Sequence, residues 1–240
     1  MTRTRQPNGS LFTASVALAT WLCLALIVSS CTFERPDAEG VIYYDLEFPF
    51  LEDNMLKNVF PEEMKLYFKD DKMYGEVRSL GGIVTTSFIA DNEAKTITQM
   101  LKNYSDYYCS TLDETGVRES LSSHPGIRYE TTDRTELIAG YTCNVTIAHF
   151  LTDSVPPITL LHTDEIDIAN PNWYTPFHEM EDVLLGYEVE QFGMRMKLRA
   201  NTVAKKMIED QMLVKREKYQ EIPVNDLSQM MSGMLTDFID

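Results

Sequence analysis

Residues 64–79 read Met-Lys-Leu-Tyr-Phe-Lys-Asp-Asp-Lys-Met-Tyr-Gly-Glu-Val-Arg-Ser. In the first run, Met64, Leu66 and Phe68 alternate with more polar neighbours, which is the period of two expected of a strand with one buried face. Lys69-Asp-Asp-Lys72 is a polar turn sequence, and a second run rich in apolar and aromatic residues follows it. The stretch therefore predicts a β-hairpin with strands at 64–68 and 73–79.

Similar runs recur along the chain at a spacing of about 8–12 residues, which is typical of antiparallel β-proteins. No stretch shows the strand–helix alternation of a parallel sheet. Polar or glycine-containing turns separate the runs, among them Thr132-Asp-Arg134 and Phe192-Gly193. We expect about ten strands in one large antiparallel sheet. Besides the hairpin, the strands are predicted at 41–48, 83–90, 95–101, 104–112, 127–132, 136–151, 158–168, 184–191 and 194–203.

Two stretches predict helices. Residues 53–60 predict a short helix with one apolar side that ends before Pro61, and the residues on that side are Met55, Leu56, Val59 and Phe60. Residues 224–239 carry apolar side chains at helical spacing, namely Val224, Leu227, Met231, Met234, Leu235 and Phe238. The chain is therefore predicted to have an α+β fold, in which a large antiparallel sheet is accompanied by a short N-terminal helix and a C-terminal amphipathic helix.

The N-terminus predicts a lipoprotein signal. Arg3 and Arg5 precede the uncharged run Leu11–Val28, and Ile27-Val-Ser-Ser-Cys31 places small residues before a cysteine. We expect cleavage between Ser30 and Cys31 and acylation of the Cys31 thiol. The alternative is an uncleaved membrane anchor, because the run lies at the short end of the roughly 17–25 residues that span a bilayer.

This signal defines the expected domain organisation. Residues 1–30 would be the signal peptide, residues 31–40 a lipidated tether, and residues 41–240 a single β-rich domain. Thr32 follows the cysteine in place of an aspartate, which argues against retention in the inner membrane. We therefore expect a lipid-anchored protein of the outer membrane of a Gram-negative bacterium, in a leaflet that the sequence leaves open.

Charge and composition narrow the classes of partner. The chain has a formal net charge of −16, and loss of Arg3 and Arg5 with the signal would change it to −18. Such acidity argues against nucleic acid and anionic lipid head groups as partners. The 13 methionines have two readings, because this side chain fills irregular cores and also lines adaptable apolar binding sites.

Candidate reactive residues are few. Cys109 and Cys143 are the cysteines of the body, and they are predicted either to form a disulfide or to be buried free thiols. The histidines, His124, His149, His162 and His178, are scattered without a metal-binding spacing. The sequence also lacks a Gly-x-Ser-x-Gly nucleophile elbow. We therefore expect no metal, no cofactor and no catalytic residue.

Three short stretches resemble Gram-negative envelope families. Thr135-Glu-Leu-Ile-Ala-Gly-Tyr-Thr-Cys143 resembles the Ile-x-Gly-Tyr-x-Cys signature of an envelope lipoprotein family with an uncharacterised domain. Asn172-Trp-Tyr-Thr-Pro176 and Leu184-Leu-Gly-Tyr-Glu188 are similar to parts of the GLPGLI family, although the second motif is degraded. The likeness extends over residues 40–223. These families resemble the periplasmic lipoprotein carrier superfamily, and that resemblance implies a curved, incomplete β-barrel over an apolar concavity.

The resulting functional prediction is a non-enzymatic, membrane-anchored lipoprotein that binds an acyl or lipid-like ligand. The residues expected to line the site are Ile83, Phe88, Val145, Ile147, Met194 and Met196. Met231, Met234 and Phe238 of the C-terminal helix are expected to cover it. One alternative is an envelope protein-interaction or scaffold module without a cavity, and another is a hydrolase with an unrecognised site.

Overall fold

The structure, a computed structural model, describes residues 38–49, 60–152, 154–191 and 194–236, and does not describe the side chains of residues 191, 194, 235 and 236. The chain forms two units, Met1–Arg35 and Pro36–Asp240, and all the described residues belong to the second. The predicted signal peptide, most of the tether and residues 53–59 of the predicted N-terminal helix lie outside the described residues.

One open sheet dominates the second unit. Its strand order is β12-β6-β5-β4-β3-β2-β1-β11-β10-β9-β8-β7, so β12 and β7 are the two edges of the sheet. The strands within the described ranges are β1 (Glu39–Glu47), β2 (Glu63–Lys69), β3 (Lys72–Ser79), β4 (Val84–Asp91), β5 (Thr96–Asn103), β6 (Asp106–Asp113), β7 (Ile127–Ile138), β8 (Tyr141–Phe150), β9 (Ile158–Thr163), β10 (Val183–Gln191), β11 (Met194–Lys205) and β12 (Gln220–Glu221).

The helices are short by comparison. Helix α2 (Glu114–Leu121) begins after Asp113, whose side chain accepts a hydrogen bond from the Gly116 amide at 2.8 Å. Helix α3 (Val224–Thr236) matches the predicted C-terminal helix, and residues 237–239 of that prediction lie outside the described part. Leu80–Gly82 and Asp210–Leu213 form 3-10 turns.

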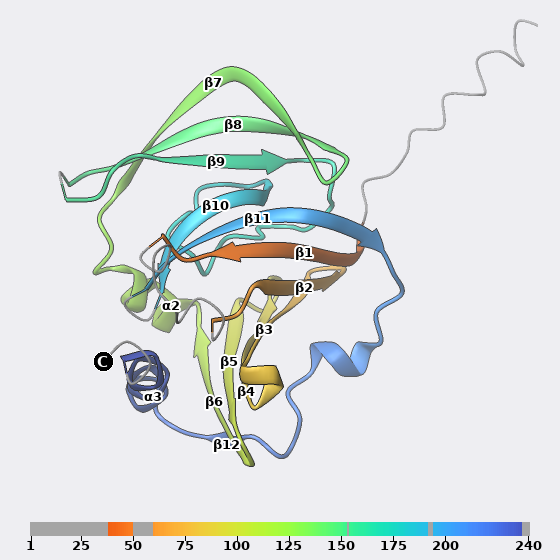
Figure 1. The fold of residues 1–240 in the computed structure, drawn as a ribbon, viewed down its shortest axis with the longest axis vertical. Helices are drawn as coiled ribbons and strands as arrows, with labels where there is room; N and C mark the ends of the chain where they lie inside the picture. Colours follow the sequence, from red (N-terminus) through yellow and green to blue (C-terminus); the bar gives the residue numbers. More distant parts are fainter. Residues whose placement is uncertain (1–37, 50–59, 153, 192–193, 237–240) are drawn as a thin grey trace, which may run out of the picture. The chain divides into compact units, whose positions relative to one another are not determined.

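The predicted α+β class is wrong, because the described residues form a mainly β fold. Twelve strands outweigh α2 with 8 residues and α3 with 13 residues. The physical reason is that helices do not form a second layer here. Instead the sheet curves, so that strands and a loop cover much of its apolar face. Figure 1 shows this curvature, since β7–β9 lie across the view and β4–β6 stand nearly upright.

Two antiparallel meanders make up the sheet. Strands β1–β6 form one and β7–β11 form the other, and β1 pairs with β11 to join them. The predicted 64–79 hairpin is confirmed, with Met64 opposite Val77 and Phe68 opposite Met73. Short β12 adds to β6 in the parallel direction. The N-terminal strand is therefore in the middle of the sheet and each meander extends outward from it.

The β7–β8 connection differs from the prediction. The turn is at Ala139-Gly140, where both residues have positive φ values of 50° and 92°, as tight hairpins with the right twist require. The polar stretch predicted to be the turn, Thr132-Asp-Arg134, is instead a bulge within β7 between Thr131 and Thr135. There the Thr132 hydroxyl donates to the Val145 carbonyl at 2.7 Å.

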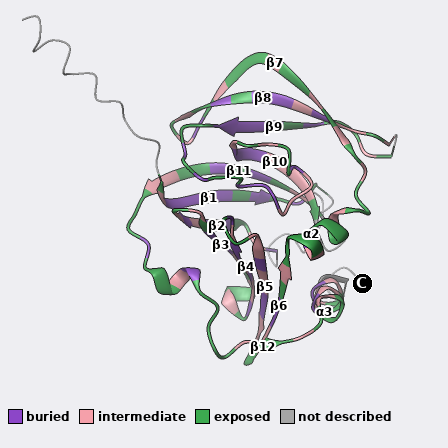
Figure 2. Ribbon diagram, turned by 180° about the vertical axis from the view of Figure 1, so that it is seen from behind, coloured by how far each residue is buried: buried purple, intermediate pink, exposed green. Residues whose placement is uncertain are grey.

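A loop between β9 and β10, residues 164–182, contacts both meanders and is called the crossing loop below. Its Trp173 donates from Nε1 to Asn92 Oδ1 at 2.9 Å and packs with Ile97 of β5. Its Phe177 packs with Leu160 and Leu184 of the other meander. Figure 2 shows that β1 and β9 are largely buried while α2 and much of β7 are exposed.

Gly75 provides a test of this packing. A methyl group at Gly75 would lie 2.1 Å from Cε1 of the Phe88 ring, which covers that glycine. Replacing Gly75 by alanine should therefore lower the free energy of unfolding by about 1–3 kcal/mol, the usual cost of overpacking. Urea denaturation measures the change.

The matched control is Gly233→Ala in α3, where an added methyl meets no atom within 4 Å. It should be neutral or stabilising by about 0.5–1 kcal/mol, because alanine favours the helix. A Gly75→Ala protein as stable as the wild type would contradict the close contact with Phe88.

Candidate functional site

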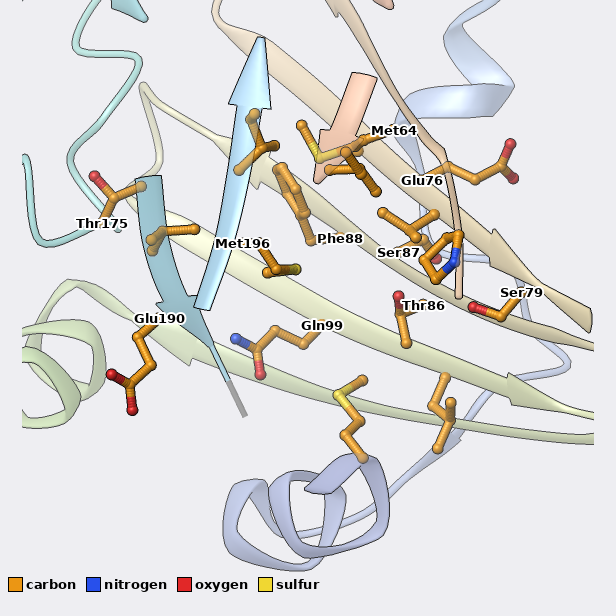
Figure 3. Close-up of a pocket in the computed structure, with 18 of the residues that line it drawn as sticks. Met64, Glu76, Ser79, Thr86, Ser87, Phe88, Gln99, Thr175, Glu190 and Met196 are labelled. Carbon is orange, nitrogen blue, oxygen red and sulfur yellow. The ribbon is translucent and has the colours of Figure 1, made fainter. Parts of the chain in front are cut away.

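An apolar cavity of about 290 Å³ is the candidate functional site. It lies on one face of the sheet, with walls from β1–β5, β10 and β11, the crossing loop and α3 (Figure 3). This volume is just below the usual range of small-molecule sites, about 300–1,000 Å³.

Strand register explains why these side chains share a face. Across the first meander, Val77 is opposite Thr86 and Phe88 is opposite Gln99. Across the junction and the second meander, Leu198 is opposite both Leu46 and Tyr187. Directly opposite residues of neighbouring strands point to the same face, so the lining is built from side chains far apart in sequence.

The lining is mostly aromatic, aliphatic and sulfur-containing. Phe88 packs on Tyr174 of the crossing loop, with ring centroids 5.3 Å apart. Burial raises the pKa of Tyr174 and of Tyr187, so both phenols stay neutral in the physiological range. Four methionines also contribute, namely Met64, Met196, Met231 and Met234. Their flexible thioethers suit an apolar guest of irregular shape.

Helix α3 covers one side of the cavity. Leu227 and Met231 are 0% and 3% exposed and pack with Val84 and Leu101 of β4 and β5. In Figure 3 the helix lies beneath the strands that carry the lining residues. This arrangement is the amphipathic packing that the 224–239 pattern predicted.

The segment before α3 is attached to the edge of the sheet at β6. The Glu221 carboxylate accepts hydrogen bonds from the Thr111 amide at 3.0 Å and from Lys215 Nζ at 2.5 Å. The Lys215 bond is the main reason why the pKa of Glu221 is lowered. The Ile222 amide donates to the Cys109 carbonyl at 2.9 Å. These bonds hold β12 and so position α3 over the cavity.

Polar groups at the cavity are few. Glu76 is ion-paired with Arg78 at 2.9 Å and accepts a hydrogen bond from the Tyr74 hydroxyl at 3.0 Å. Glu190 and His124 are exposed at the rim, whereas Thr86 and Gln99 are only partly exposed. Figure 3 shows Thr86 and Gln99 among the apolar side chains.

The predicted lining residues fall into three groups. Phe88, Met196, Met231 and Met234 line the cavity. Ile83, Val145 and Ile147 do not: Ile83 is 49% exposed beside a glycine turn, and the other two belong to the core around β8. The Met194 side chain and all of Phe238 lie outside the described part.

Sequence reasoning missed several lining residues, including Leu46, Val77, Tyr187, Val189 and Leu198. Their strands do show the alternation of one apolar face, so the signal was present. What the alternation cannot provide is the position of each strand across the sheet, and position decides which apolar faces meet at the cavity.

The two body cysteines are separate. Cys109 on β6 and Cys143 on β8 are both free thiols and are both 0% exposed. Of the two alternatives, the structure therefore has the buried thiols and not the bridge. Burial raises the pKa of each thiol to about 11, so the reactive thiolate is rare at neutral pH.

A hydrogen-bonded Thr–His–Asp chain lies near the crossing loop. His162 Nε2 is 3.0 Å from the Thr146 hydroxyl, and its Nδ1 is 2.6 Å from Asp182 Oδ2. This order of groups resembles a nucleophile–base–carboxylate triad. Thr146 is only 3% exposed, His162 is 8% exposed, and neither lines the apolar cavity. Because the hydroxyl is buried, we interpret these hydrogen bonds as structural: they hold the end of the crossing loop at Asp182.

The described residues also lack two other features, a metal-binding cluster and a membrane-spanning helix. No group of three or more His, Cys, Asp or Glu side chains there could hold a metal ion. No described helix combines the length and apolar character needed to cross a membrane.

Comparisons with known proteins show the fold alone. No family model matches the chain, and no curated protein matches it. Among solved structures, PNGF-II is similar with a TM-score of 0.51 and 15% sequence identity. The likeness covers 80% of this chain and 32% of that one, so the chain spans about a third of the length of PNGF-II. The resemblance to envelope lipoprotein families stays a prediction.

The cysteines give a prediction on reactivity. In the native protein without reductant, Cys109 and Cys143 should resist iodoacetamide at pH 8, because they are buried and their pKa values are near 11. In urea, still without reductant, both should be alkylated completely. Peptide mass spectrometry measures the labelling. A disulfide-linked peptide pair in the unreduced sample would contradict the structure.

Proposed function

We propose that this protein is a lipid-anchored lipoprotein of the Gram-negative cell envelope whose domain binds an apolar, acyl-like ligand. The observation that carries the proposal is the cavity of about 290 Å³ with a mostly apolar lining. Apolar surface of this kind is favoured to leave water, by roughly 25 cal/mol per Å² buried. A ligand with an apolar body therefore fits the site better than a polar metabolite.

Anchoring is the second part of the proposal and depends on the N-terminal sequence. Acylation of Cys31 would attach residues 31–240 to a membrane, with the outer membrane favoured by Thr32. Two or more acyl chains are needed for stable attachment. The partners of the protein are then the membrane, through these chains, and the apolar ligand. Nucleic acid is disfavoured by the net charge of −16.

The scaffold alternative has one observation in its favour. Edge strand β7 leaves Leu137 72% exposed, and a free edge can pair with a strand of another protein. Its sequence opposes that use, because a bulge interrupts it near Asp133 and charges recur at Glu130, Arg134 and Glu136. Bulges and charges are the usual protection of edge strands against pairing, so the cavity is the better supported site.

The hydrolase alternative has less support. The Thr146–His162–Asp182 group has the order of a triad, but its hydroxyl is buried, with Thr146 only 3% exposed, and it does not line the apolar cavity. We therefore retain ligand binding without catalysis, and without a cofactor, as the proposed activity.

Ligand binding can be tested with a charge placed in the cavity. Met196→Asp should weaken binding of the apolar fluorophore N-phenyl-1-naphthylamine by at least about tenfold, because a carboxylate in an apolar site costs several kcal/mol. Met207→Asp is the control, since Met207 is 85% exposed and does not line the cavity. Fluorescence titration of the full mature protein measures both. No saturable binding by the wild type would exclude the binding proposal.

Anchoring can be tested separately. Cys31→Ser removes the thiol that would accept the lipid, so metabolic labelling with an alkyne fatty acid should disappear and the unprocessed precursor should accumulate. Cys109→Ser is the control: it should still incorporate the fatty-acid label, because Cys109 is not the predicted acylation site. Equal labelling of wild type and Cys31→Ser would refute the lipoprotein assignment.

A further inference from the structure

We infer that the ligand of this cavity is an uncharged amphiphile whose polar group hydrogen-bonds with Thr86 and Gln99. The inference rests on the proposed function and goes further by naming the chemistry of the ligand's head. The class includes fatty alcohols, fatty amides and monoacylglycerols, and it leaves out fatty acids, which are anions at neutral pH.

Thr86 on β4 and Gln99 on β5 are neighbours in the part of the cavity lining that these two paired strands form. Phe88 is opposite Gln99 and Thr86 is opposite Leu101, so the two polar residues are diagonal across the β4–β5 pair. Diagonal positions on one face are close enough for a single polar group to contact both side chains. In Figure 3 their polar ends lie in the region between Met196 and α3.

Both side chains have unused hydrogen-bonding capacity. Within the described residues, neither has a hydrogen-bond partner in the protein. Two other polar side chains at the cavity, Thr175 and Glu76, do have partners. Thr175 donates to the Asn172 carbonyl at 2.9 Å and accepts from the Phe177 amide at 3.1 Å. Glu76 is held by Arg78 and Tyr74.

Thr86 and Gln99 are partly exposed, so water can bond with their polar groups while the site is empty. A ligand that displaces this water must replace its hydrogen bonds or leave these groups unsatisfied, which favours a ligand with a matching polar group. Thr86 offers a hydroxyl, and Gln99 offers an amide oxygen and an amide nitrogen, so together they can donate and accept. A ligand with a hydroxyl, amide or ester group can form hydrogen bonds with these donors and acceptors. A purely apolar ligand leaves them without partners.

Charge decides between neutral and ionised heads. The described residues that line the cavity include two carboxylates, Glu76 and Glu190, and no lysine or arginine, and His124 at the rim is their one basic side chain. Arg78 beside the cavity is already bound to Glu76 at 2.9 Å. The chain as a whole carries −16. An anionic head would therefore meet repulsion from Glu190, with no lysine or arginine in the described lining to neutralise it. A cationic head would gain little, because Glu190 is exposed to solvent and screened.

The experiment compares three ligands with the same ten-carbon chain. 1-Decanol, decanoate and decylammonium are titrated at pH 7.5 against the mature protein loaded with N-phenyl-1-naphthylamine. We expect decanol to displace the fluorophore at a concentration at least about tenfold lower than decanoate, and lower than decylammonium. The comparison is made within the wild type and needs no variant to fold.

Variants then assign the head-group contacts. Thr86→Val and Gln99→Leu approximate the shape of each side chain and remove its hydrogen bonds. Each should therefore weaken decanol binding about three- to tenfold relative to the same variant's affinity for the fluorophore, which is titrated for each variant. Thr85→Val is the matched control, because Thr85 is the neighbour on the opposite face of β4 and does not line the cavity. This control should change neither the affinity for decanol nor the affinity for the fluorophore.

The outcomes separate the two proposals. Wild-type protein that binds no fluorophore overturns the proposed function, and the head-group assignment with it. Fluorophore binding in which decanoate or decylammonium competes as well as decanol overturns only the assignment of a neutral head. Decanol affinity unchanged in both Thr86→Val and Gln99→Leu overturns the assignment of these two residues.

Discussion

The pairing of β1 with β11 is the constraint on which the structure depends. It places residues near the start of the domain opposite residues about 160 positions later, with Leu46 facing Leu198 and Tyr44 facing Ala200. Without this pairing the chain would form two separate meanders, each with an uncovered apolar face. The buried Tyr44 hydroxyl strengthens the junction, since it donates to the Leu184 carbonyl at 2.9 Å. Such long-range pairing is costly in loop entropy and makes folding slow.

The cavity is a consequence of the same junction. Once joined, the meanders curve toward each other, and the crossing loop lies between them. Its Trp173 contacts the first meander and its Phe177 contacts the second. It fills one end of the concave face, and α3 covers another through Leu227 and Met231. The space left between them is the cavity. The cavity is therefore bounded by two segments that are distant in sequence, the crossing loop and α3. Its volume depends on how firmly each of them is attached to the sheet.

The attachments differ in chemistry. Trp173 is held by a buried hydrogen bond to Asn92, and the far end of the crossing loop is held by the Thr146–His162–Asp182 bonds. Helix α3 is held instead by apolar contacts and by Glu221 at the edge of β6. The hydrogen bonds of Glu221 at the sheet edge are exposed, whereas Leu227 and Met231 are buried, so burial of apolar side chains contributes more than these bonds to the attachment of α3.

Local pattern was enough to find most of the strands and the last helix, although it missed β12 and misplaced the boundary between β7 and β8. The alternation in Met64–Val77 and the helical spacing of Leu227 and Met231 are local properties, and each predicted its element before any tertiary contact was known. The β7–β8 turn was misplaced because polar residues mark bulges as well as turns. The left-handed conformation that made the turn, at Ala139, has little signature in that residue type.

The sequence by itself determined that the domain is rich in antiparallel strands and that the chain is acidic, with a net charge of −16. Its N-terminus predicts a lipoprotein signal, and that prediction lies outside the described residues. Tertiary structure alone decided that β1 joins the meanders, that Cys109 and Cys143 lie apart, and that Thr86 and Gln99 share a cavity with Met196. The physical reason is that the alternation of apolar and polar residues along a strand indicates only which residues share one of its faces. The neighbours of that face depend on pairings between segments far apart in the chain, and no local pattern records them.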